Sequence, residues 1–144
     1  MSMQQMLLAS GEPPIVWSDY LSANTITART NAFDGSLTTY AEGPQYNTMR
    51  FRTKNNGSLK TIYLSGVIEV YLLRGGNVYC ATQNGPGGAY QAINFYAASN
   101  QWTQVGSSSV TDLWQMEFEY ISWQGGIGLQ LAAIRVDGTI LTDP

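Results

Sequence analysis

The chain has 144 residues, which is enough for one domain with a substantial core but not for two. Only 12% of the residues are charged and the net charge is −3, so neither a nucleic-acid backbone nor a strongly charged partner is expected. The absence of histidine and the presence of one cysteine exclude histidine-ligated zinc sites, Ser-His-Asp and Cys-His catalysis, and an intrachain disulfide.

The N-terminal segment differs in composition from the rest of the chain. Met3, Met6, Leu7 and Leu8 precede the breaker Gly11-Glu12-Pro13-Pro14. The segment lacks a basic region, and its apolar run is too short for a signal peptide or a membrane span, so we expect folding in a cytoplasm and no membrane partner. Residues 1–12 are predicted to form an arm that docks on a partner through these four side chains. The alternative is a strand or helical turn packed on its own domain, or a frayed end.

Residues 13–144 alternate short apolar stretches with dense turn signals, and no window shows a sustained helical period. This pattern predicts a single all-β domain. The apolar row of residues 58–72 is interrupted at Gly66, which predicts a bend or a close backbone approach there. The expected strands cover residues 15–20, 48–53, 58–72, 77–82, 91–96, 102–105, 113–123, 129–136 and 139–141.

Strict alternation of large and polar residues marks the stretch from Trp114 to Tyr120. It predicts that Trp114 and Phe118 point into the core and that Glu117 and Glu119 point to solvent. Two carboxylates on one face superficially suggest a glycosidase pair, but the regular alternation favours an ordinary solvent face. Because no other reaction class stands out, we expect a protein without enzymatic activity and without a cofactor.

Two glycine-containing tetrapeptides are predicted to be tight hairpin turns, Arg74-Gly75-Gly76-Asn77 and Val136-Asp137-Gly138-Thr139. Cys80 lies in an alternating β pattern and is predicted to be a small buried hydrophobe. A longer loop is expected at residues 84–89 and a turn at residues 124–126, and the polar loop 106–109 shows no evident chemistry.

A pair of short segments near the two ends of the chain carries a family resemblance. They are Asn31-Ala32-Phe33-Asp34-Gly35-Ser36 and Ala133-Ile134-Arg135-Val136-Asp137-Gly138. The chain resembles discoidin-like (galactose-binding-like) modules, and still more the small β-domains of marine cyanophage virion proteins. The resemblance covers roughly residues 15–142 and implies a single jelly-roll, discoidin-like antiparallel β-sandwich.

In discoidin-like modules the loop that corresponds to residues 31–36 helps to hold a structural calcium ion. Here only Asp34 matches, while Ser36, Ala41 and Ala133 stand where further ligands or a tryptophan are common. Asp34 is therefore a weak calcium candidate, and we expect no bound metal. The alternative role for its carboxylate is to cap the amides of an Asp-Gly turn.

Aromatic side chains near strand ends and in loops are candidates for contact with a glycan or with another protein. A sandwich core also needs large side chains, so packing within the domain is the alternative for each of them. The candidates are Trp17, Tyr40, Tyr46, Trp102 and Trp123.

The resemblance and the low charge together predict a virion structural protein of a tailed phage, assembled in the host cytoplasm. An exterior capsid decoration (knob) or a small tail or fibre component would contact the major capsid protein, a tail protein or further copies of itself. The alternative is a carbohydrate-binding module that recognises glycans of the host surface. Aromatic residues and the analogy of fold are the support for this second function.

Overall fold

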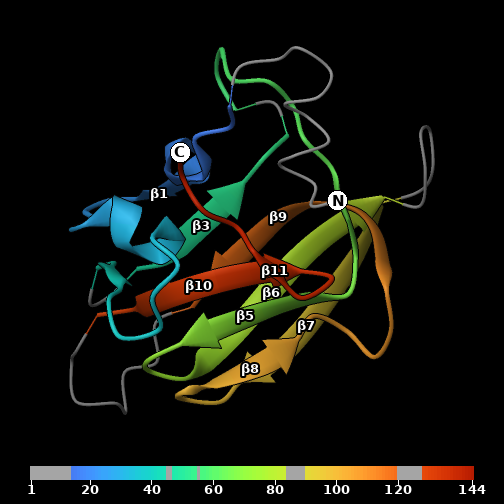
Figure 1. Cartoon of the computed structure of the whole chain (residues 1–144). Helices are drawn as coiled ribbons and strands as arrows, with labels where there is room; N and C mark the ends of the chain where they lie inside the picture. The colour runs from blue at the N-terminus through green and yellow to red at the C-terminus, as the bar shows by residue number, and fades with distance from the viewer. Residues whose placement is uncertain (1–13, 45–46, 55, 84–89, 120–127) are drawn as a thin grey trace.

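The computed structural model describes residues 14–44, 47–54, 56–83, 90–119 and 128–144, and it shows two antiparallel sheets packed face to face (Figure 1). The predicted all-β sandwich is therefore confirmed. The larger sheet has the order β1 (Leu21–Ala23), β3 (Met49–Arg52), β9 (Val110–Phe118), β6 (Gly76–Gln83) and β7 (Tyr90–Ala97), and β4 (Leu64–Gly66) also pairs with β9. The smaller sheet has the order β11 (Thr139–Ile140), β10 (Gln130–Val136), β5 (Ile68–Leu72) and β8 (Gln101–Gln104), and β2 (Ala41–Glu42) also pairs with β10.

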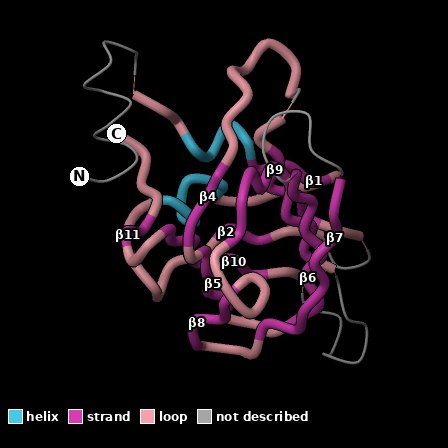
Figure 2. Tube along the Cα trace, turned by 90° about the vertical axis from the view of Figure 1, so that its right-hand side faces the viewer, coloured by secondary structure: helices cyan, strands magenta, loops and turns pink. Residues whose placement is uncertain are grey.

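The core fills the space between the two sheets. Figure 2 shows the molecule turned by 90° from the view of Figure 1. Period-2 alternation along each strand sends one set of side chains inward. Phe118 is fully buried, as the sequence predicts, and it lies between Met49 on β3 and Val78 on β6. The opposing sheet contributes the buried side chains Ile68, Val70, Leu72, Leu131 and Ile134.

The strand predicted at residues 15–20 is wrong. Residues Trp17–Tyr20 form the 3₁₀ helix η1, and the strand β1 begins only afterwards. The helical turn directs the Trp17 indole into the core, 6.4 Å from the ring centres of both Tyr20 and Phe51. A short apolar run fits a strand and a helical turn equally well, and burial of the indole decides between them here.

The predicted bend at Gly66 is confirmed. Gly66 has a φ of 128°, and the pairing of β4 with β9 shifts its register between Leu64 and Gly66. The next amide, Val67 N, donates a hydrogen bond to Oδ1 of Asp137 at 2.8 Å. The expected strand at residues 58–72 is thus two strands, β4 and β5, which belong to different sheets.

One of the two predicted hairpin turns is confirmed and the other is wrong. Asp137 and Gly138, with φ of 50° and 81°, connect the paired strands β10 and β11. Arg74 to Asn77 instead carries the chain from the smaller sheet to the larger one, because β5 and β6 pair with different strands. Gly75 serves close packing there, since a Cβ atom at this position would lie 2.7 Å from the Ala97 carbonyl oxygen.

The segment after β10 returns to the N-terminal side of the domain. Asp143 N donates to the carbonyl of Phe33, the last residue of the 3₁₀ helix η2 (Arg29–Phe33), at 2.9 Å. Ser18 N in η1 donates to Oδ1 of Asp143 at 3.2 Å. These bonds join residues that are far apart in the sequence, and they hold Asp143, near the C-terminus, to both 3₁₀ helices.

Candidate functional site

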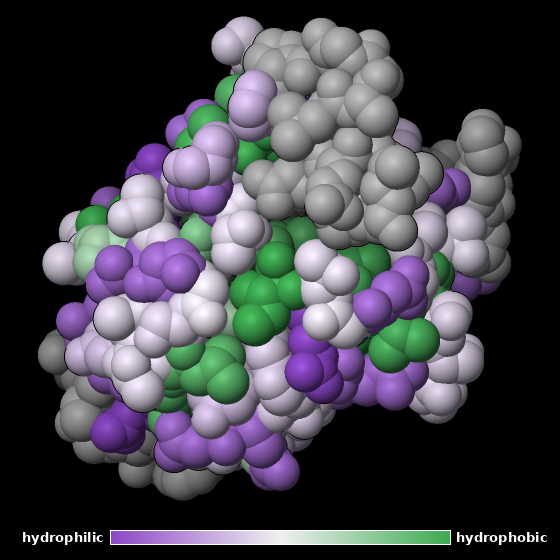
Figure 3. Space-filling view, viewed as in Figure 1, coloured by the Kyte–Doolittle hydropathy of each residue, from purple (hydrophilic) through white to green (hydrophobic). Residues whose placement is uncertain are grey.

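The outer face of the smaller sheet carries a cluster of aromatic and charged side chains. Ile68, Val70 and Leu72 of β5 point inward, so Glu69 and Tyr71 point outward. The cross-strand neighbours on this face are Trp102 beside Tyr71 and Arg135 beside Glu69. We call Glu69, Tyr71, Trp102 and Arg135 the outer cluster; hydrophilic and hydrophobic residues are interspersed on this side of the molecule (Figure 3).

Arg135 links the charged and aromatic halves of the outer cluster. Its Nε and Nη2 donate to the two carboxylate oxygens of Glu69 at 2.7 and 2.9 Å. Its guanidinium carbon lies 4.1 Å from the ring centre of Trp102, in cation-π contact. Tyr71 meets the same indole edge-on, with ring centres 5.4 Å apart. The carboxylate thus orients the guanidinium, and the guanidinium covers part of the indole.

The Glu69–Arg135 pair predicts a pH-dependent contribution to stability. Hydrogen bonding from Arg135 lowers the pKa of Glu69, and partial burial offsets this only in part. A lowered pKa means that the pair stabilises the fold above the unfolded value of about 4.3, and that this contribution is lost as the pH falls through the folded value. At pH 7 we expect Glu69→Gln to cost at most about 1 kcal/mol, because the pair is partly exposed.

Thermal melts of both proteins from pH 7 to pH 3 would measure this effect, and the two curves should converge at the acidic end. A difference that stays constant across the range would show that the charge of Glu69 contributes nothing. Arg135→Lys is a useful comparison, since it retains the charge but removes the bidentate contact.

Of the five predicted aromatic contact residues, the structure places two at or near the surface and buries a third in the core. Trp102 belongs to the outer cluster, and Tyr40 is half-buried just before β2. The expectation for Trp17 is wrong, because its indole has no exposed area and is closed off by the core. Tyr46 and Trp123 lie outside the described residues, as do Met3, Met6, Leu7 and Leu8 of the predicted arm.

Trp114 is not the core tryptophan that alternation predicts. Along β9, Leu113 pairs with Thr82 and Gln115 with Ala81, so Trp114 is the extra residue of a β-bulge. The bulge shifts the inward parity of the strand, and Leu113, Met116 and Phe118 form the buried set instead. Trp114 is half-buried, and the cationic groups of Arg52 and Lys54 lie 5.6 and 4.9 Å from its ring centre.

Glu117 of β9 and Glu119, which directly follows this strand, face outward, as alternation predicts, and both have polar partners. Arg50 Nη2 lies 2.9 Å from Oε2 of Glu117. Glu119 accepts hydrogen bonds from the Tyr79 hydroxyl at 2.9 Å and from Asn77 Nδ2 at 3.1 Å. The hydrogen bond to Glu119 and the nearby negative charge raise the pKa of Tyr79. This face of the larger sheet is therefore a network of neutral and charged pairs.

Asp34 caps its own loop. One carboxylate oxygen accepts the amide of Ser36 at 2.9 Å, and the other accepts the hydroxyl of Thr39 at 2.5 Å. This is the alternative role proposed for it from the sequence. Within the described ranges, no group of three or more His, Cys, Asp or Glu side chains is placed to hold a metal ion.

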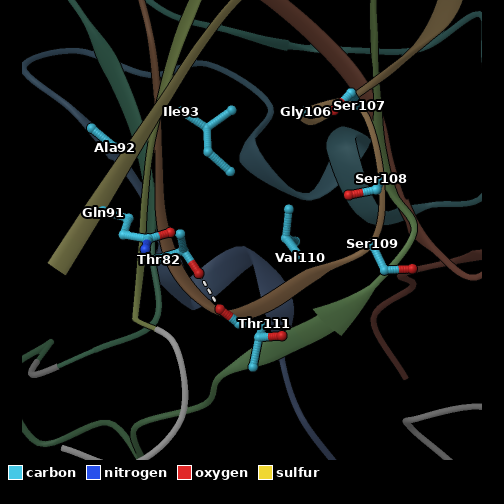
Figure 4. A pocket seen from close by; sticks show the side chains of 10 residues that line it. All are labelled: Thr82, Gln91, Ala92, Ile93, Gly106, Ser107, Ser108, Ser109, Val110 and Thr111. Atoms are coloured by element: carbon cyan, nitrogen blue, oxygen red, sulfur yellow. Dashed lines mark hydrogen bonds between the residues drawn. The ribbon is translucent and has the colours of Figure 1, made fainter. Parts of the chain in front are cut away.

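A polar hollow lies at one end of the sandwich, between the start of β7 and the loop that joins β8 to β9. The loop 106–109, which shows no chemistry in the sequence, supplies three serines to it (Figure 4). Ile93 and Val110 form its apolar part, and the Thr82 hydroxyl donates to the Thr111 carbonyl at its edge. The lining carries no charged group, so the hollow offers neutral hydrogen-bonding groups only.

Cys80 is buried on the inner face of β6, as predicted, and burial raises the pKa of its thiol to about 12. We expect the folded protein to react with an aromatic disulfide reagent far more slowly than the unfolded protein, because the reactive species is the thiolate. Thiol titration at pH 8 with and without denaturant measures the two rates. Equal rates would mean that the strand opens readily or that Cys80 is accessible.

No family model, no curated protein and no solved structure matches this chain. In the part of the chain that the structure describes, no helix is long and apolar enough to cross a membrane.

Proposed function

We propose that this chain is a non-enzymatic structural protein of a tailed-phage virion and that it decorates the exterior of the capsid. The resemblance of residues 31–36 and 133–138 to marine cyanophage virion domains supports this assignment. A β-sandwich with few charges suits a protein whose outer faces contact other proteins. A small tail or fibre component is the variant within the same class.

The covered indole of Trp102 is the observation that favours a protein partner. A sugar ring stacks on a free aromatic face, whereas here Arg135 lies over the indole and Tyr71 meets it edge-on. Tryptophan, tyrosine and arginine held rigidly together are the residues enriched at the energetic centres of protein interfaces. With Trp17 buried as well, two of the five predicted aromatic contacts are poorly placed for sugar stacking.

Binding to virions that lack the protein tests the proposal. Purified wild-type protein should co-sediment with such particles and should appear on the capsid exterior in a reconstruction. Trp102→Ala should weaken binding more than about tenfold if the outer cluster is the contact surface. Tyr63→Ala is the matched control, because Tyr63 is an exposed aromatic residue outside the outer cluster.

A glycan array separates this function from the alternative, a carbohydrate-binding module for host-surface glycans. A decoration protein should bind nothing there. Binding to a defined glycan that Trp102→Ala abolishes, with no retention on particles, would overturn the virion assignment.

Anchoring through residues 1–12 stays a prediction from the sequence. Deleting residues 2–11 should leave a folded domain with an unchanged β-sheet circular dichroism spectrum that no longer co-sediments with particles. Burial of Met3, Met6, Leu7 and Leu8 would contribute roughly 1.5 to 3 kcal/mol for each side chain fully removed from water, before the cost of ordering. Full retention of the truncated protein would contradict the arm, and failure to fold would place the segment inside the sandwich.

A further inference from the structure

The edge strands of the two sheets differ greatly in length. The strands β1, β4, β8 and β11 have three, three, four and two residues, whereas β7 at the end of the larger sheet has eight. Natural sandwiches keep exposed edges short, because each unpaired edge can pair with a strand of another chain. At about 3.3 Å per residue, β7 offers an edge about 26 Å long.

None of the usual protective features interrupts β7. Its sequence, Tyr-Gln-Ala-Ile-Asn-Phe-Tyr-Ala, contains no charged residue, no proline and no glycine. The pairing with β6 has no register shift between its first pair, Gly76 with Ala97, and its last pair, Gln83 with Tyr90, so no bulge twists the strand away. Among the described strands, β7 pairs only with β6, and Figure 1 shows it beyond β6 at the margin of the sheet.

The side chains of β7 suit a neutral polar contact. Three exposed side chains of β7 point outward, those of Ala92, Asn94 and Tyr96. Their cross-strand neighbours on β6 are Ala81, Tyr79 and Asn77. Tyr96 is 48% exposed, the largest exposed fraction among the large hydrophobic residues in the described ranges. Ile93 and Phe95 point toward the inside of the sandwich and are only half-buried.

We propose that β7 pairs antiparallel with β7 of a second copy of this chain, so that the larger sheets of two molecules form one continuous sheet across a two-fold axis. The two strands of such a contact are identical, so any net charge on β7 would be brought against the same net charge on its copy. The complete lack of charge on this strand removes that repulsion. This inference is independent of the proposed virion function.

A two-fold axis through Asn94 gives the register with the best side-chain match. Asn94 then lies opposite Asn94 of the partner, where the two amides can hydrogen-bond. On the outer face Tyr96 lies opposite the partner's Ala92, so a large side chain always meets a small one. On the inner face Phe95 lies opposite the partner's Ile93, which extends the apolar layer of both sandwiches.

Charge reversal at the axis tests the proposal in the full chain. Sedimentation velocity over a wide concentration range should show a monomer–dimer equilibrium for the wild type. Asn94→Lys and Asn94→Glu should each weaken self-association at least about tenfold, because like charges then face each other on the axis. An equimolar mixture of the two variants should recover the dimer. Ser22→Lys adds the same charge to the exposed face of the short edge strand β1 and should leave association unchanged.

A cysteine scan then checks the register. Asn94→Cys should form an intermolecular disulfide under oxidised glutathione, since residues directly opposite each other have Cα atoms within bridging distance. Ala92→Cys should not, because its own copy lies several residues away across the axis. The buried Cys80 adds little background. A protein that stays monomeric up to millimolar concentration, or a dimer that Asn94→Lys leaves intact, would overturn the proposal.

Discussion

Replacing Phe118 by alanine is expected to lower the free energy of unfolding by about 3 to 5 kcal/mol, the largest single-residue effect that we predict for this domain. Phe118 has no exposed area, and its strand β9 lies in the middle of the larger sheet, between β3 and β6. Backbone pairing on both sides prevents the surrounding strands from collapsing into the cavity, so most of the cavity cost should remain.

Glu117→Gln is the matched control for Phe118→Ala, because it alters the neighbouring residue on the opposite face of the same strand. Its only expected cost is that of the Arg50 pair, whose side chains are 44% and 25% exposed, and this should be less than about 1 kcal/mol. Urea denaturation monitored by tryptophan fluorescence measures both variants. Equally small effects at the two positions would mean that neighbouring side chains fill the space that Phe118 leaves, so that no cavity remains.

Gly66→Ala is expected to cost at least about 2 kcal/mol. The φ of 128° at this position is one that residues with a side chain rarely adopt, and an added Cβ would lie 2.5 Å from Oδ2 of Asp137. That carboxylate has little freedom to move, because its other oxygen accepts the Val67 amide. Backbone strain and the steric clash should therefore add together.

Gly57→Ala measures the cost of a positive φ in the absence of a steric clash. Gly57 also has a positive φ, of 63°, but nothing lies within 4 Å of a Cβ placed there, so only the backbone cost of about 1 kcal/mol should appear. The double variant Gly66→Ala with Asp137→Ala relieves the clash and should recover part of the loss relative to the sum of the single variants. Strict additivity in this cycle would show that the carboxylate does not limit the space at Gly66.

Local patterns in the sequence were sufficient for several features that depend on one strand or one turn. Alternation from Trp114 to Tyr120 predicted the buried Phe118 and the outward Glu117, because neighbouring side chains of a strand point to opposite faces. The gap at Gly66 predicted the bend, and the Asp137-Gly138 step predicted the hairpin, since both depend on backbone conformations that glycine and aspartate allow. Burial of Cys80 followed from the same alternation.

The sequence by itself thus determined the fold class, the burial of Phe118 and Cys80 and the turn at Asp137-Gly138, whereas the tertiary structure decided which strands share a sheet and which side chains meet. Gly75 was predicted as a hairpin residue, but β5 and β6 belong to different sheets, so Gly75 lies in a crossover between them. A bulge turned Trp114 outward, and core packing turned Trp17 inward. The outer cluster joins Glu69 and Arg135 across 66 positions of sequence. No local pattern encodes such a pairing, because it results from the order in which distant strands hydrogen-bond.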